Sequence, residues 1–252
     1  GIRPYLGNNL IRNITYQDCE RWLIGRGKEL KASAYRQERQ LMIGVLKAAE
    51  RDGMILDNPA KLLPNRKLPR IEIQLPTHGQ FRSLIKQMHL ADSRGIHGAY
   101  LVELLAYSGM RLNEAVNLLW DDINFERGCF TVTGGEYGTK NHEIRTVPLF
   151  PAMRELLERI RSGRAEIDSD HVTLIKGART LMASAAKKAG IPRFTHHSMR
   201  HYFCSNAIEA GIDFKVIAGW LGHKDGGILV AKTYGHLRDA HSFEMAKRMT
   251  QG

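Results

Sequence analysis

The sequence predicts a mainly helical protein with one small three-stranded antiparallel sheet, an α+β fold, divided into two domains. Three observations support this prediction. Most apolar residues recur at helical spacing, short β-prone runs alternate with glycine-containing turns in one region, and a basic, proline-containing segment separates two parts of the chain. With 252 residues and 43% hydrophobic content, the chain can bury a core in each part.

The first domain is expected over residues 1–70. Thr15 is a suitable N-cap, with Asp18 three residues further on, and Gly25 and Gly27 are expected to end the short helix that Thr15 opens. Residues 33–50 predict an amphipathic helix. Its expected inward face comprises Leu41, Val45, Ala48 and Ala49, with Met42 and Leu46 beside them. Residues 63–70, Leu-Pro-Asn-Arg-Lys-Leu-Pro-Arg, then indicate an extended linker, because a residue before proline is kept out of the helical region.

The second domain is expected over residues 75–252. Thr77 and Gln80 form a capping-box pattern, and a more hydrophobic helix over residues 98–107 should stop at Gly109. The next helix carries Arg111 and Glu114, three residues apart, for which an ordinary intrahelical salt bridge is the simplest interpretation. Strands are predicted over residues 122–125, 129–132 and 144–147, followed by helices over 151–160, 179–189, 200–210 and 213–221.

Composition limits the class of protein. A formal net charge of +11 favours a polyanionic partner, although a basic protein without such a partner is an equally valid interpretation of charge alone. The three cysteines, Cys19, Cys129 and Cys204, are widely spaced and predict neither a disulfide framework nor a zinc site. No apolar run has the length of a membrane span, so we expect an intracellular, cytoplasmic protein with no membrane partner.

Side chains that can hold and attack a phosphate occur in an ordered series. The series runs through Ser108-Gly109-Met110-Arg111, Gly138-Thr139-Lys140, Thr195-His196-His197-Ser198-Met199-Arg200-His201, Leu221-Gly222-His223 and Lys232-Thr233-Tyr234. A His-x-x-Arg pair occurs twice. His197 with Arg200 belongs to the series, whereas His142 with Arg145 is interpreted as a chance pair, or at most as two contacts to a nucleic-acid backbone.

This Arg…Lys…His-x-x-Arg…His…Tyr series resembles the tyrosine recombinases, the phage-integrase family of DNA breaking-and-rejoining enzymes. The resemblance covers roughly residues 75–240 and, more loosely, residues 1–70. It implies that the catalytic residues are Arg111, Lys140, His197, Arg200, His223 and the nucleophile Tyr234, with Glu114 and His201 in support.

The resemblance also implies an architecture and a set of partners. Residues 1–70 would be a core-binding domain, shorter than the usual four or five helices, which indicates a missing first helix or a removed arm-binding segment. With the catalytic domain it would close as a C-shaped clamp on double-stranded DNA. The protein would be a monomer or dimer off DNA and a homo-tetramer on paired sites, with accessory DNA-bending proteins as candidate partners. Its reaction would integrate or excise a mobile element through a 3′-phosphotyrosine linkage, without cofactor or metal.

Several alternatives stand beside this interpretation. A type IB topoisomerase shares the catalytic set, and a DNA-binding protein could keep the fold without turnover. His196, His197 and His201 have spacings that could ligate zinc, but they lack the intervening Glu of the metalloprotease motif and an obvious further ligand. Trp220 is interpreted as a core residue rather than as a platform for stacking a base.

Overall fold

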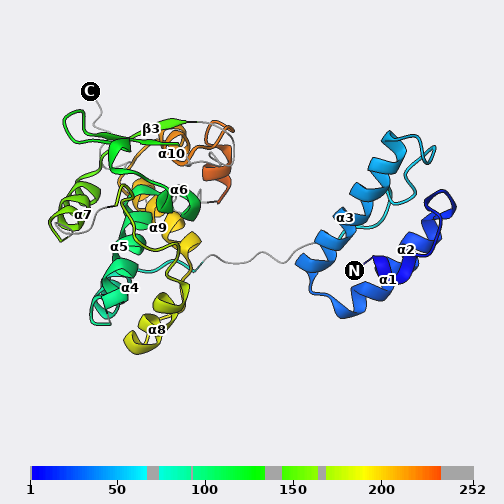
Figure 1. The fold of residues 1–252 in the computed structure, drawn as a ribbon, viewed down its shortest axis with the longest axis horizontal. Helices are drawn as coiled ribbons and strands as arrows, with labels where there is room; N and C mark the ends of the chain where they lie inside the picture. Colours follow the sequence, from blue (N-terminus) through cyan, green and yellow to red (C-terminus); the bar gives the residue numbers. More distant parts are fainter. Residues whose placement is uncertain (1, 67–73, 92, 134–143, 164–168, 234–252) are drawn as a thin grey trace, which may run out of the picture. The chain divides into compact units, whose positions relative to one another are not determined.

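The computed structural model describes residues 2–66, 74–91, 93–133, 144–163 and 169–233 (Figure 1). By its internal contacts the chain separates into two compact units, Gly1–Glu72 and Ile73–Gly252. We describe each unit by itself. Across the described ranges, no helix combines the length and the apolar character needed to cross a membrane.

The first unit is helical throughout its regular structure. Its elements are α1 (Arg3–Leu6), the 3₁₀ turn η1 (Ile11–Asn13), α2 (Tyr16–Glu29) and α3 (Ala32–Arg51). The Thr15 side chain accepts from the Asp18 backbone N–H while the Asp18 carboxylate accepts from the Thr15 backbone, which confirms Thr15 as the cap of α2. The core of this unit is built from Leu6, Cys19, Trp22, Leu23, Tyr35, Met42, Leu46, Ala60 and Leu63.

The two glycines of α2 do not end the helix, contrary to the sequence prediction. The helix continues through Gly25 and Gly27 to Glu29. Gly27 is buried, and a Cβ at this position would lie 3.1 Å from Nη2 of Arg66 and 3.2 Å from the ring of Tyr35. The glycine therefore allows α2 to pack closely against its neighbours, and this packing outweighs its weak helix propensity.

The inward face of α3 also differs from the prediction. Met42, Leu46 and Ala49 are buried together with Tyr35, whereas Leu41 and Val45 are 56% and 47% exposed. Both sets of residues recur at three- and four-residue intervals, so helical periodicity is satisfied by either face. The contact with α2 selects the face that contains Tyr35 and Met42.

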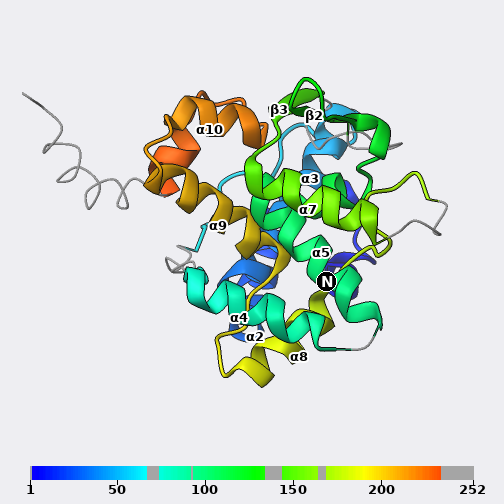
Figure 2. The same ribbon diagram turned by 90° about the vertical axis from the view of Figure 1, so that its left-hand side faces the viewer.

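The second unit surrounds a buried central helix, α5 (Ser93–Ser108), which packs against α4, α7, α8 and α9 (Figures 1 and 2). The surrounding helices are α4 (His78–His89), α6 (Leu112–Val116), α7 (Pro151–Ser162), α8 (Arg179–Ala189), α9 (His196–Glu209) and α10 (Phe214–Leu221). A short 3₁₀ turn, η2 (Trp120–Asp122), leads into the sheet. The capping box of Thr77 and Gln80 at the start of α4 is confirmed.

The sheet is three-stranded and antiparallel, in the order β1-β2-β3, as the sequence predicts. Its strands are β1 (Ile123–Asn124), β2 (Cys129–Val132) and β3 (Arg145–Pro148). Phe130 and Val147 are paired across β2 and β3, and both are fully buried on the core side. This register places Arg145, the first residue of β3, opposite Val132.

Helix α9 begins four residues earlier than predicted. The Thr195 hydroxyl accepts from the backbone N–H of Ser198, and the Ser198 hydroxyl accepts from the backbone of Thr195, so Thr195 is the N-cap and His196 the first helical residue. The predicted start at Arg200 is therefore wrong. As a consequence His197 and Arg200 belong to one helix, and residues three apart in a helix are neighbours on its surface.

Candidate active site

Arg111 lies between two helices. A left-handed turn at Gly109, with φ of 67°, ends α5, and Arg111 is the N-cap of α6, just outside the helix that was expected to contain it. Glu114 is 3% exposed, accepts from the Arg111 backbone N–H at 2.9 Å and accepts from Nη1 of Arg111 at 2.8 Å. The simple salt bridge suggested by the sequence is thus present, while 27% of the Arg111 side chain stays exposed.

Arg200 is held almost entirely inside the second unit. Arg200 is only 5% exposed to solvent. Nη1 donates to the carbonyl of Gly109 at 2.6 Å, and Nη2 donates to the carbonyl of Leu221 at 2.7 Å. The guanidinium thereby connects the end of α5 with the end of α10.

His223 joins the same group of side chains. It follows Gly222, which ends α10 in the left-handed conformation with φ of 67°. Nη2 of Arg200 lies 3.1 Å from Nε2 of His223. A guanidinium can only donate, so Nε2 is the acceptor and the ring proton of neutral His223 resides on Nδ1. That Nδ1 atom is buried and has no hydrogen-bond partner within the described residues.

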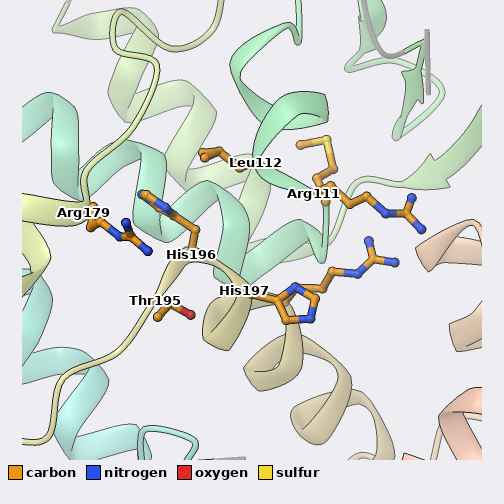
Figure 3. Close-up of a pocket in the computed structure, with 8 residues that line it drawn as sticks. Arg111, Leu112, Arg179, Thr195, His196 and His197 are labelled. Carbon is orange, nitrogen blue, oxygen red and sulfur yellow. The ribbon is translucent and has the colours of Figure 1, made fainter. Parts of the chain in front are cut away.

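A cavity of about 750 Å³ opens beside these residues. It is lined by Met110, Arg111, Leu112, Arg179, Thr195, His196, His197 and Arg200. Figure 3 shows Arg111 and His197 toward one end and Arg179 and His196 toward the other. No acidic side chain of the described residues lines the cavity, so its three guanidiniums favour an anionic ligand.

The pKa values in the site reflect burial and concentrated positive charge. Burial, together with the charge of Arg111, lowers the pKa of Arg200 to about 9, which leaves its guanidinium charged at neutral pH. Burial, then Arg200 and Arg111, lowers the pKa of His197. Burial and His197 lower the pKa of His201 to about 4, and the two rings meet edge to face with centroids 4.4 Å apart. At neutral pH these imidazoles are therefore neutral.

Burial by itself would raise the pKa of Glu114, but its contacts reverse that effect. Hydrogen bonds and charge from Arg145, followed by the hydrogen bonds from Arg111, outweigh burial and hold the Glu114 pKa below its ordinary value. The carboxylate is accordingly ionised at neutral pH. It can anchor neighbouring guanidiniums but cannot supply a proton.

Arg145 is not the chance residue that the sequence suggests, and the structure corrects that interpretation. Its side chain is 11% exposed and donates to Glu114 through Nη2 at 2.7 Å, so it is not placed as a contact to a nucleic-acid backbone. Arg179 and His196 are likewise cavity residues that the catalytic series does not include. The only signals for them in the sequence are the basic start of α8 and the two adjacent histidines, both too common to be diagnostic.

Two expected site residues, Lys140 and Tyr234, lie outside the described residues, as does His142. Residues 228–233 are helical, and Tyr234 follows them directly. Trp220 packs against Phe150 and Phe203, with ring centroids 4.9 and 6.4 Å away, in agreement with a core role. Across the described part of the chain, no cluster of three or more His, Cys, Asp or Glu residues could hold a metal ion, and Nε2 of His196 instead accepts from the Ala178 backbone.

Comparisons with known proteins find similarity to one family. The model of the phage integrase family matches residues 76–241. Tyrosine recombinase XerD of Neisseria meningitidis is 31% identical over 192 residues, which cover 70% of this chain and 63% of that protein. The match thus spans less than two thirds of XerD. A tyrosine recombinase of Thermosipho africanus is 28% identical over 264 residues, which cover 97% of this chain and 88% of that protein.

The fold is also shared with solved structures. A lambda integrase tetramer bound to a Holliday junction superimposes with a TM-score of 0.74 at 19% identity, over 92% of this chain and 68% of that chain. This likeness establishes a tyrosine recombinase fold. Since the family model matches well over half of the residues, the chain belongs to the phage integrase family.

Proposed function

We propose that this protein is a site-specific DNA recombinase that cleaves and rejoins strands through a 3′-phosphotyrosine linkage to Tyr234. The observation that carries the proposal is the grouping of Arg111, His197 and Arg200 around one cationic cavity, with His223 hydrogen-bonded to Arg200. Membership of the phage integrase family supports the same conclusion.

Arg111 and Arg200 can stabilise the transition state of phosphodiester cleavage. Displacement at phosphorus adds negative charge to the non-bridging oxygens, and guanidiniums that are already in place stabilise that charge without reorganisation. Arg200 is held by protein carbonyls and Arg111 by Glu114, so both are oriented before a ligand arrives. His223 would donate a further hydrogen bond to the phosphate.

The nucleophile needs a base and the leaving group an acid. A phenol with a pKa near 10 is only about 0.1% ionised at neutral pH, so attack requires removal of its proton. His197, neutral at this pH and situated at the cavity, would receive the proton of Tyr234. Lys140 would protonate the departing 5′-oxygen, and His201 would support His197. The linkage retains the bond energy, so rejoining needs neither ATP nor a metal.

The rest of the chain would serve DNA binding and assembly. We assign residues 1–70 to a DNA-binding core domain and residues 75–252 to catalysis, the two together closing as a C-shaped clamp on double-stranded DNA. Paired sites would be recombined by a homo-tetramer, in integration or excision of a mobile element. The net charge of +11 supports a polyanionic partner.

A nicked suicide substrate tests the proposal. The bound sequence is first selected from a random duplex pool, and a duplex nicked beside the cleavage site is then incubated with the protein in EDTA. We expect a covalent protein–DNA adduct that resists denaturation and maps to Tyr234. Tyr234→Phe should abolish the adduct and leave DNA affinity nearly unchanged.

The control is Tyr5→Phe, which removes a hydroxyl from a 51% exposed tyrosine of the first unit and should leave the adduct intact. DNA binding without any adduct from the unmodified protein would contradict the proposal and would instead support a DNA-binding protein without turnover.

A further inference from the structure

We propose that Arg145 is a positioning residue of this site, which aims Arg111 through the carboxylate of Glu114 and fixes the turn before His223 through the carbonyl of Trp220. The inference rests on the proposed function, because it gives Arg145 a role at the same phosphate site. It extends that function to a residue outside the catalytic series.

Glu114 is shared between two arginines. Its Oε2 accepts from Nη2 of Arg145 at 2.7 Å and from the backbone N–H of Arg111 at 2.9 Å. Its Oε1 accepts from Nη1 of Arg111 at 2.8 Å and from Nη1 of Arg145 at 3.3 Å. Each carboxylate oxygen therefore accepts two hydrogen bonds, and these compensate for the loss of water around the buried charge.

The two arginines are exposed to different extents. The Arg145 side chain is 11% exposed, against 27% for Arg111, and only Arg111 of the two lines the cavity. Arg145 is thus the buried counter-ion of Glu114, and Arg111 is the member that faces a ligand. One carboxylate between two guanidiniums leaves one net positive charge. Without Arg145, Glu114 would neutralise Arg111 and weaken its attraction for a phosphate.

A second set of contacts connects Arg145 with His223. Nε of Arg145 donates to the carbonyl of Trp220 at 2.8 Å. A Cβ at Gly222 would lie 3.0 Å from Nη1 of Arg145, so the guanidinium packs directly against this left-handed turn. His223 is the next residue. Arg145 therefore joins β3, the start of α6 and the end of α10 through one side chain.

Substitution of Arg145 tests the inference by kinetics. In single-turnover cleavage of the nicked substrate, Arg145→Ala should slow adduct formation by about 10²- to 10³-fold, as for loss of an oriented charge-stabilising group. Its DNA dissociation constant should change by less than about threefold, since neighbouring cations still hold the backbone. Arg145→Lys restores the charge but not the two-pronged geometry, and should recover only part of the rate.

Arg159→Ala is the matched control for lost stability. Arg159 donates at 2.8 Å to Glu103, a carboxylate that is 5% exposed, in the same unit but outside the cationic cavity. This variant should melt at a lower temperature and still cleave at the normal rate per folded molecule. Normal cleavage by Arg145→Ala would overturn the inference, and so would an equal slowing by Arg159→Ala.

A double variant tests whether Arg145 acts through Glu114. Because Gln cannot neutralise Arg111, Glu114→Gln combined with Arg145→Ala should cleave no more slowly than Arg145→Ala alone. Multiplied losses would show two independent effects and would count against the inference.

A titration separates this inference from the proposed function. The charged groups that act on Glu114 and its surroundings are Arg111, Arg145 and Arg200. In carboxyl-carbon NMR, the Glu114 pKa should rise in Arg145→Ala, because burial is then opposed by Arg111 alone among its hydrogen-bond donors. If the unmodified protein forms no adduct, the proposed function fails. The titration can still be measured in that case, and it then decides by itself whether Arg145 acts on Glu114. An unchanged Glu114 pKa would refute the positioning role.

Discussion

Arg200 donates a hydrogen bond of 2.6 Å to the carbonyl of Gly109, a residue 91 positions earlier in the chain. Gly109 has φ of 67°, and a Cβ there would lie 2.4 Å from Cδ1 of Phe203. The orientation of the buried guanidinium thus depends on a backbone turn that only glycine allows.

We therefore expect Gly109→Ala to lower both stability and cleavage rate. The left-handed conformation alone costs an alanine about 1–2 kcal/mol, and the clash with Phe203 adds to it and displaces the carbonyl that holds Arg200. Gly190→Ala is the matched control. Gly190 has φ of 65° but nothing within 4 Å of a Cβ. Thermal melting and single-turnover cleavage should show that only Gly109→Ala loses activity beyond its loss of stability.

The hydrogen bond between Arg200 and His223 predicts which nitrogen of His223 serves the phosphate. Since Nε2 accepts from Arg200, the donor must be Nδ1–H, which is buried without a bound phosphate and must therefore become accessible when DNA binds. Asn places its amide nitrogen near the position of Nδ1, whereas Gln reaches the position of Nε2. His223→Asn should accordingly keep more of the single-turnover cleavage rate than His223→Gln. The opposite order would mean that DNA binding breaks the contact with Arg200 and turns the ring.

Arg179 is expected to contribute to DNA affinity rather than to the chemical step. It lies at the end of the cavity opposite Arg111 and His197, where it could contact a neighbouring phosphate (Figure 3). Arg179→Ala should reduce the slope of log affinity against log salt by about 1 and leave the cleavage rate of bound DNA nearly unchanged. Fluorescence anisotropy at several salt concentrations measures the slope. A loss of cleavage rate at saturating DNA would instead place Arg179 in the reaction.

The histidines around α9 predict that acid destabilises the second unit before carboxylates protonate. Burial is the first cause of lowered pKa values for His196, His197, His201 and His223 in the folded state. The unfolded chain therefore binds more protons as pH falls below about 6.5, and folding stability decreases from there toward pH 4. The low pKa of Glu114 adds a loss only at more acidic pH.

Hydrogen exchange of α9 peptides in urea, at pH 7, 6 and 5, measures this effect for the second unit alone. His201→Asn should reduce the pH dependence, because it removes the histidine whose pKa is lowered to about 4. His171→Asn, which replaces an exposed histidine outside α9, is the control substitution. Equal stability at pH 7 and pH 5 would contradict the expected sign.

Local sequence was sufficient for several elements of this fold, although not for the end of α2 or the start of α9. The capping boxes at Thr15 and Thr77, the alternation in β2 and β3, and the glycine after α10 each operate within a few residues, so their patterns are visible in the chain itself. The ordered series of Arg, His and Tyr residues likewise indicates the family, because order and spacing along the chain are properties of the sequence alone.

Tertiary structure alone decided which face of α3 is buried, that α2 continues through Gly27, and that Arg145 belongs to the site. Helical periodicity is compatible with more than one buried face of α3. A glycine in a sequence can mark either the end of a helix or a close contact within it, and only the position of Tyr35 beside Gly27 distinguishes the two. Arg145 and Glu114 are 31 residues apart, and their ion pair exists only because β3 and α6 meet in the folded unit. A local sequence pattern cannot predict this ion pair, because the contact depends on how distant elements pack together.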